Sequence, residues 1–277
     1  TPLPVKTSDE VGELTGSFNS MVHQLKERME MKEAMNLAME VQQNLLPKKM
    51  PQIKGLEIAA RSIYCDETGG DLYDFLEVDD RNGGRIGIVV GDVSGHGIPA
   101  ALLMATVRAF LKSRVTQPGS SAEIISDVNR LITYDTGDTG QFMTLFYAVF
   151  DTGNKELQWV RAGHDPAIFY DPAKDEFKEL NGYGMALGLD GKFKYRENML
   201  AGLTMGQLLL IGTDGLWETQ SQSGEMFGKD RIKALIKKNA NASPAKILEA
   251  IISALREFQG LMKQEDDVTL AVIKVSE

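Results

Sequence analysis

The spacing of apolar positions changes character near residue 50. Before that point the chain has no proline or glycine between Gly16 and Leu46, and apolar residues recur at intervals of three and four. This near-heptad stripe predicts one long, coiled-coil-like helix over residues 8–46. The stripe consists of Val11, Leu14, Phe18, Met21, Leu25, Met35 and Met39. Because such a stripe needs a partner surface, we expect a parallel homodimer through this helix; packing onto the rest of the chain is the alternative.

Pro47 and Pro51 end the helical region, and short apolar blocks follow. These blocks predict strands over 73–78, 85–90, 141–150, 156–161, 167–170, 176–180, 208–212 and 268–275, and helices over 98–115, 122–134, 229–238 and 244–259. Gly83-Gly84 predicts a hairpin between the first two strands. Since strands and helices come in runs, a layered α+β domain is favoured over a doubly wound one.

Composition limits the class of protein. With 277 residues, of which 43% are hydrophobic, the chain can bury one substantial core and carry a smaller appendage. The net charge of −9 argues against nucleic acid as a partner. Cys65 is the single cysteine, so an internal disulfide and a cysteine-rich zinc site are excluded. The chain opens at Thr1-Pro2 without methionine, and we expect it to be part of a larger protein.

Candidate chemistry lies in four short acidic or glycine-bearing groups. They are Gly69-Gly70-Asp71, Asp92 within residues 91–97, Thr213-Asp214-Gly215 and Glu265-Asp266-Asp267. Taken singly, each could be an ordinary turn. Several of the aspartates follow apolar runs, which places carboxylates at strand ends, and hard oxygen ligands in that arrangement suit Mg²⁺ or Mn²⁺.

In their order and spacing these groups resemble the PPM family of metal-dependent serine/threonine phosphatases (the type 2C superfamily), in particular its SpoIIE/RsbU-like branch. The resemblance covers about residues 40–275. It includes further blocks at residues 41–47, 97–102, 142–147, 162–166 and 267–269. The resemblance implies an αββα sandwich of two mostly antiparallel sheets flanked by helices, and a metal-activated water that attacks phosphoserine or phosphothreonine.

The resemblance also implies roles for individual residues. The residues implied as catalytic are Asp71, Asp92, Asp214 and Asp266. The implied metal ligands are the same four residues together with the Val93 carbonyl and Asp267. Two or more Mn²⁺ or Mg²⁺ ions would be bound, because a phosphomonoester dianion repels hydroxide and a pair of divalent ions both neutralises charge and ionises a bridging water.

Two positions depart from the eukaryotic pattern. Asp66 stands where eukaryotic members have a phosphate-binding arginine, and Arg61 lies too early to replace it. Gly70 stands where a glutamate is often found. The phosphate contact is therefore left without an assigned residue. We interpret His96 and His164 as structural, the second through a hydrogen bond to a backbone group in its own turn.

Residues 4–28 are similar to the second half of a HAMP domain, a signal relay next to membrane spans in bacterial receptors. We expect a partial HAMP and signalling helix over 1–30, a linker helix over 31–52 and the phosphatase domain over 53–277. The expected function is the cytoplasmic output of a membrane-associated bacterial sensor, with a phosphorylated STAS-type anti-anti-sigma factor as substrate and membrane contact only upstream of residue 1. A weakly active metal-binding signalling module is the alternative. A diguanylate cyclase hairpin at residues 69–75 would leave the last two acidic groups unexplained.

Overall fold

The structure is a computed structural model that describes residues 2–66, 68–78, 84–137 and 139–277. The chain divides into two units, residues 1–43 and 44–277, which are described separately. Among the described residues, no helix has both the length and the apolar character that a membrane crossing requires.

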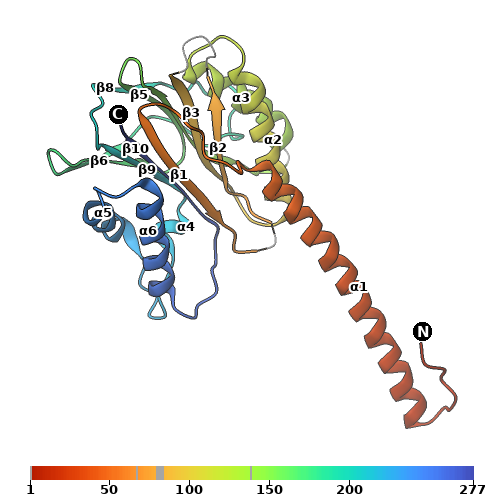
Figure 1. Ribbon diagram of the computed structural model, residues 1–277. Helices are drawn as coiled ribbons and strands as arrows, with labels where there is room; N and C mark the ends of the chain where they lie inside the picture. Colours follow the sequence, from red (N-terminus) through yellow and green to blue (C-terminus); the bar gives the residue numbers. More distant parts are fainter. Residues whose placement is uncertain (1, 67, 79–83, 138) are drawn as a thin grey trace. The chain divides into compact units, whose positions relative to one another are not determined.

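The first unit is formed almost entirely by helix α1 (Glu10–Leu45), as the apolar stripe predicts (Figure 1). Asp9 caps its start, with Oδ1 accepting the backbone N–H groups of Val11 and Gly12 at 3.2 and 3.3 Å. The segment before the helix folds back along it, because the Asn19 side chain bonds both backbone groups of Leu3. The stripe residues Val11, Leu14, Phe18, Met21 and Leu25 are all exposed.

The second unit contains two five-stranded sheets in which all neighbouring strands are antiparallel. One sheet has the order β1 (Leu56–Ile63), β10 (Val268–Val275), β9 (Leu208–Gly212), β6 (Ala167–Asp171), β7 (Glu176–Leu180). The other has the order β2 (Leu72–Glu77), β3 (Arg85–Val93), β4 (Met143–Asp151), β5 (Glu156–Ala162), β8 (Asn198–Ala201).

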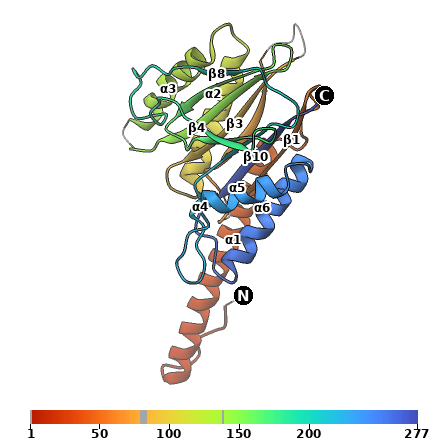
Figure 2. The same cartoon turned by 90° about the vertical axis from the view of Figure 1, so that its left-hand side faces the viewer.

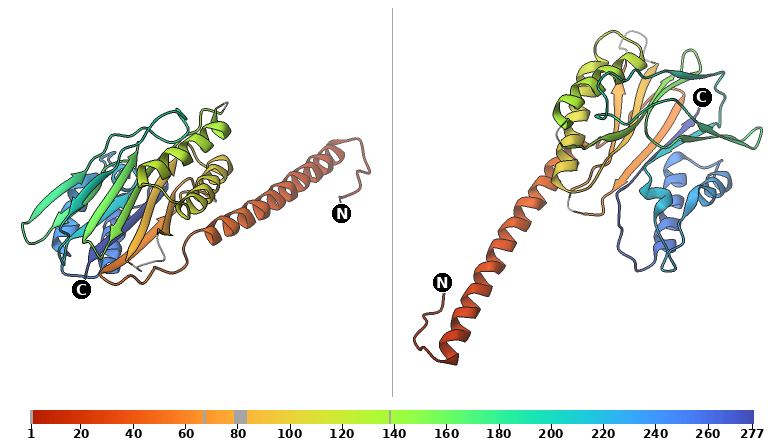
Figure 3. Two further views of the ribbon diagram at one scale, coloured as in Figure 1. Left: turned by 90° about the horizontal axis from the view of Figure 1, so that it is seen from above. Right: turned by 180° about the vertical axis from the view of Figure 1, so that it is seen from behind.

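Helices cover the outer face of each sheet. Helices α2 (Ile98–Val115) and α3 (Ser121–Thr136) lie over the sheet that contains β3, and α5 (Gly228–Lys238) and α6 (Pro244–Gln259) lie over the sheet that contains β10 (Figures 2 and 3). The helix starts follow local chemistry, since α3 has a capping box between Ser120 and Glu123 and α2 carries a proline in its first turn. The expected αββα sandwich is confirmed.

The predicted strands and helices agree with the structure to within three residues at their ends. Strands β2 and β3 pair as the hairpin prediction requires, but Gly83 of the predicted turn lies outside the described residues. Three elements were missed: strand β1, the short strand β8 and the single-turn helix α4 (Gly215–Glu218). Strand β8 gives little sequence signal because it is a four-residue edge strand without β-branched or aromatic residues.

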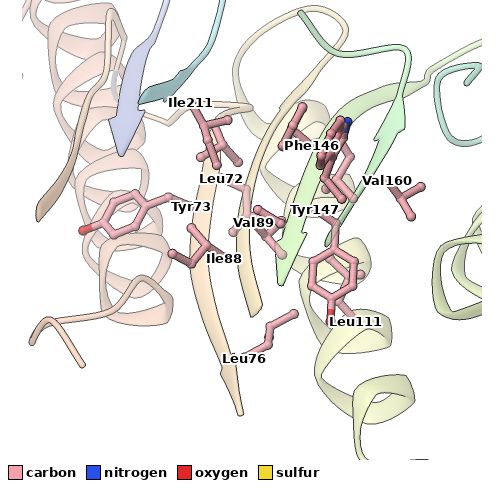
Figure 4. Packing of buried hydrophobic residues seen from close by; sticks show 14 of the residues in the cluster. Leu72, Tyr73, Leu76, Ile88, Val89, Leu111, Phe146, Tyr147, Val160 and Ile211 are labelled. Carbon is pink, nitrogen blue, oxygen red and sulfur yellow. The ribbon is translucent and has the colours of Figure 1, made fainter. Parts of the chain in front are cut away.

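The core lies between the two sheets and continues under α2 and α3. Figure 4 shows Leu72, Ile88 and Val89 of β2 and β3 near Phe146 and Tyr147 of β4. The run 86–91 is buried throughout, because β3 is an inner strand with the second sheet on one face and helices on the other. A strand covered on both faces is read as a continuous apolar run, which explains why this segment does not alternate.

Close packing around Gly87 gives a stability prediction. A Cβ atom at Gly87 would lie 2.7 Å from Cε2 of the Tyr147 ring. We therefore expect Gly87→Ala to lower the free energy of unfolding by about 1–3 kcal/mol, measured by urea denaturation.

The matched control for this prediction is Gly153→Ala, where the nearest atom to the added Cβ is Asp151 Oδ1 at 3.4 Å. That change should be nearly neutral. Adding Tyr147→Leu to Gly87→Ala should remove most of the steric penalty as a non-additive term in a double-mutant cycle. Equal costs at Gly87 and Gly153 would contradict this packing argument.

Candidate metal centre

The four acidic groups come from strand ends that meet at one edge of the sandwich. Asp71 directly precedes β2, and Asp92 is the last residue but one of β3. In the other sheet Asp214 follows β9 at the start of α4, while Asp266 and Asp267 directly precede β10. Backbone and side-chain hydrogen bonds join these ends across the two sheets, so residues separated by up to 196 positions in the chain lie together.

Asp71 is buried and is held by a threonine of the opposite sheet. The Thr213 hydroxyl donates to Oδ2 of Asp71 over 2.9 Å and accepts the backbone N–H of Thr269 over 3.0 Å. Burial raises the pKa of the Asp71 carboxyl well above its usual range, and the charges of Asp92 and Asp267 raise it further. The site therefore places a carboxylate where water solvates it poorly.

The pKa values of the other carboxyl groups are raised for the same two reasons, burial and neighbouring negative charge. Burial raises the pKa of Asp92 to about 8, with further contributions from the charges of Asp214, Asp266 and Asp267. Burial is also the main cause of the raised pKa of Asp214, followed by the charge of Asp266. The pKa of Asp266 is raised first by burial and then by Asp267, while His96 lowers it. Like charges at this edge thus oppose one another's ionisation.

The donor types at this edge suit a divalent cation, which would favour the charged form of each carboxylate. Within the described part of the chain, no group of three or more His, Cys, Asp or Glu side chains is arranged so that it could hold a metal ion. Carboxylate and carbonyl oxygens are the ligands that Mg²⁺ and Mn²⁺ prefer.

The Val93 carbonyl lies beside this set. A Cβ atom at Gly70 would come within 2.9 Å of the Val93 carbonyl oxygen and 3.3 Å of Ala100 Cβ. The residue before Asp71 therefore has little room for a side chain, which gives a physical reason for glycine where related phosphatases often have glutamate. The metal-ligand role of Val93 stays a prediction.

Asp267 and its neighbour Asp266 have different surroundings. The Asp267 carboxylate is buried and accepts the backbone N–H groups of Cys65 and Gly70, each over 2.9 Å. It thereby holds the segment that leads into Asp71. The Asp266 carboxylate accepts the backbone N–H of Asp267 over 2.8 Å. The geometry thus gives Asp267 the contacts of a structural support, and its assignment as a metal ligand stays a prediction.

His164 joins the two sheets next to the acidic edge. Its Nε2 lies 3.0 Å from the Gly212 carbonyl at the end of β9, and its Nδ1 lies 2.8 Å from the hydroxyl of Thr144, which pairs with Asp92. Burial lowers the pKa of His164 to about 4, so the ring is neutral at pH 7. Because a carbonyl only accepts, Nε2–H donates to Gly212 and Nδ1 accepts from Thr144. The expected hydrogen bond to a backbone group is present, but the carbonyl belongs to Gly212 at the end of β9 and not to the histidine's own turn.

His96 is exposed, and its Nδ1 lies 3.3 Å from Oδ2 of Asp66. Lys263 Nζ lies 3.2 Å from the other oxygen of Asp66. The residue at the family's arginine position is thus an acid with two basic neighbours.

Sequence reasoning missed the supporting residues around the carboxylates. Thr213 was included only as part of a motif, and Thr144 and Thr269 were not singled out. The sequence does not show which group a threonine hydroxyl will bond, because the partners here lie far away in the chain. The pair Gly69-Gly70 was a usable signal, since an added Cβ at Gly69 would lie 2.1 Å from Oδ2 of Asp267.

Comparison with known proteins agrees with this geometry. The family model for Stage II sporulation protein E (SpoIIE) matches residues 82–276, and the HAMP domain model matches residues 1–27. The chain is 29% identical to Phosphoserine phosphatase RsbU of Bacillus subtilis over 247 residues, which is 89% of this chain and 71% of RsbU. It is 31% identical to Protein IcfG of Synechocystis sp., covering 96% of this chain and 46% of IcfG.

Solved structures share the fold. The SiaA-PP2C domain of Pseudomonas aeruginosa superposes with a TM-score of 0.79 at 23% identity, covering 90% of this chain and 99% of that domain. RsbX in complex with magnesium superposes with a TM-score of 0.61 at 17% identity, covering 82% of this chain and 99% of RsbX. The two antiparallel five-stranded sheets between helix layers give the chain the fold of the SiaA-PP2C domain. With a family match over residues 82–276, the chain belongs to the Stage II sporulation protein E (SpoIIE) family.

Proposed function

We propose that the second unit is a Mg²⁺- or Mn²⁺-dependent protein serine/threonine phosphatase that acts on phosphoserine. The observation that carries this proposal is the meeting of Asp71, Asp92, Asp214 and Asp266 at one sandwich edge, where burial and mutual repulsion raise their pKa values. The printed name of RsbU as a phosphoserine phosphatase and the magnesium in the RsbX structure support the reaction and the metal.

In this proposal, some residues of the chain would bind the metal ions and others would hold those ligands in position. Asp71, Asp92 and the Val93 carbonyl would hold the metal pair, with Asp214 and Asp266 as further ligands. Bound divalent ions supply charge neutralisation at the phosphoryl group and lower the pKa of water. Thr213 orients the Asp71 carboxylate through its 2.9 Å hydrogen bond. Asp267 fixes Cys65 and Gly70 through their backbone N–H groups, and the neutral His164 fixes Thr144 beside Asp92.

The substrate and the setting extend this proposal. We infer a phosphorylated STAS-type protein as substrate and a membrane-associated bacterial sensor as the whole protein, with the HAMP-like segment as relay and any membrane contact made outside these residues. The boundaries we propose are 1–30 for the relay, 31–52 for the linker helix and 53–277 for the phosphatase domain. The active domain would be on the cytoplasmic side.

A second candidate function is a metal-binding signalling module with little turnover that acts through dimer contacts. The exposed apolar stripe of α1 favours it. Hydrolysis of p-nitrophenyl phosphate with Mn²⁺, compared with the same assay in EDTA, distinguishes the two candidates.

Substituting a proposed metal ligand should separate activity from stability. We expect Asp92→Asn to abolish Mn²⁺-dependent hydrolysis and, in EDTA, to raise the free energy of unfolding by about 1–2 kcal/mol, because it removes a repelled carboxylate. The pKa of Asp92 is raised in the folded protein to about 8, so the wild type loses stability as the pH rises from about 4 toward 8. The gain in the variant should therefore grow over that pH range, measured by urea denaturation.

Asp71→Asn and Asp214→Asn should likewise abolish turnover. The control is Glu179→Gln, which removes a carboxylate that pairs with Lys233 outside all four acidic groups and should leave turnover nearly unchanged. Near-normal turnover in Asp92→Asn would contradict the metal assignment.

The two adjacent aspartates before β10 should respond differently. Asp266→Ala should weaken Mn²⁺ binding strongly with little loss of stability. Asp267→Ala should cost about 1–3 kcal/mol of stability in EDTA, because it leaves the N–H groups of Cys65 and Gly70 without their acceptor, and should weaken Mn²⁺ binding less. Calorimetric titration with Mn²⁺ and urea denaturation measure the two effects; a larger loss of metal affinity at Asp267 would reverse our assignment.

The N-terminal helix should determine the oligomeric state. We expect the chain to be a parallel dimer in light scattering, and Phe18→Glu combined with Leu25→Glu to give monomers, because both exposed side chains belong to the near-heptad stripe. Turnover on a phosphoprotein should change in those monomers. A monomeric wild type would refute the dimer, and unchanged turnover in a confirmed monomeric variant would refute the coupling.

A further inference from the structure

A small pocket adjoins the candidate metal centre. Its volume is about 200 Å³, and its wall includes Asp266 and Gly215, the residue that follows Asp214. Pockets for whole small-molecule ligands usually measure about 300–1,000 Å³. This volume suits a side chain of a polypeptide better than a separate small ligand.

The lining of the pocket combines apolar and polar groups. Met226 and Met262 line it and are 53% and 46% exposed, and the adjacent Leu261 is 95% exposed. Methionine is flexible and polarisable, so two of them can adapt to an apolar side chain.

Three acids, Glu218, Glu265 and Asp266, line the pocket with one base, Lys263, whose Nζ lies 3.2 Å from Asp66. The lining therefore has an excess of negative charge, which would disfavour an acidic occupant.

The amide side chains of Gln220 and Gln259 also line the pocket and can contact a bound peptide. An amide carries both donors and an acceptor, so it can bond the backbone of an extended segment. The pocket thus offers apolar contact for a side chain and hydrogen bonds for the chain that bears it.

The pocket walls are held in place by the protein itself. Residues 220 and 226 form an antiparallel bridge, and the Ser221 N–H donates to the Glu225 carbonyl over 2.9 Å. Arg231 donates to the carbonyls of Met226 and Phe227 over 3.1 and 2.8 Å. A pocket shaped before its ligand arrives loses less entropy on binding.

The segment after α6, which forms another wall of the pocket, is held by a hydrogen bond to β1. Gln264 Nε2 donates to the carbonyls of Ile63 and Asp266 over 2.8 and 2.7 Å, which ties the segment after α6 to the acidic edge. The position of the pocket relative to Asp266 is therefore set by hydrogen bonds within the second unit.

We propose that this pocket receives an apolar side chain next to the phosphoserine of the protein substrate and thereby selects the substrate. The inference rests on the phosphatase function proposed above. A phosphoserine whose phosphoryl group reaches the carboxylates at Asp266 brings its neighbouring residues to the pocket wall, because consecutive residues advance by only about 3.3–3.6 Å. The substrate class is thus a phosphoserine segment with an apolar, non-acidic neighbour.

The test uses pairs of peptides with a non-hydrolysable phosphonate in place of phosphoserine. Each pair differs only by Leu or Glu at one of the two positions on either side of the phosphonate. With the wild-type chain and Mn²⁺, fluorescence anisotropy should give about tenfold tighter binding of the Leu peptide at one of these positions. Met226→Lys should bring that ratio to one or below, because it removes the apolar contact and adds a charge that attracts the Glu peptide.

Met199→Lys is the matched control, since Met199 on β8 is 59% exposed and is not part of the pocket; it should keep the wild-type ratio. Equal binding of the two peptides at every position, or a tenfold ratio that survives Met226→Lys, would overturn the pocket assignment. Hydrolysis of p-nitrophenyl phosphate is measured in parallel. A ratio that follows the pocket without any Mn²⁺-dependent hydrolysis supports the pocket and refutes the phosphatase function alone.

Discussion

The carboxylates at one edge of the sandwich repel one another, and the packing of the rest of the fold must offset that repulsion. Asp71, Asp92, Asp214 and Asp266 all have raised pKa values with burial as the main cause, so the protein alone gains nothing from holding them together. The stabilising free energy comes from elsewhere, chiefly from the apolar layer between the sheets. A site that weakens its own fold in this way is typical of a functional centre, and the proposed cation would reverse the cost.

The groups that support these carboxylates are neutral. Thr213 donates to Asp71, and backbone N–H groups donate to Asp267. His164 is itself neutral because burial lowers its pKa to about 4. Nearby basic side chains pair instead with acids outside the proposed ligand set, as Lys263 does with Asp66 and Lys229 with Asp165. A guanidinium paired with Asp71 would satisfy the charge that a metal must neutralise, so neutral donors preserve the affinity for a cation.

The sequence was informative where chemistry follows local pattern. Aspartates at the ends of apolar runs predicted strand ends correctly, and the periodicity of residues 8–46 predicted α1. It was uninformative where a residue acts through a distant partner. The support that Asp267 gives to Gly70 joins positions 197 residues apart, and the link from His164 to Gly212 crosses between sheets. Single-turn α4 and edge strand β8 were missed because neither is long enough to display a period.

Reaction and selectivity are assigned to different parts of the fold. The proposed metal ligands lie at or next to strand ends in the two packed sheets, where buried neighbours fix the backbone. The pocket with Met226 and Met262 is formed by α4, the loop between α4 and α5, the last residue of α6 and the segment after it, all outside the two sheets. Loops tolerate sequence change better than strands do. The pocket residues can therefore change without disturbing the carboxylates, so that the proposed substrate preference would vary separately from the proposed reaction.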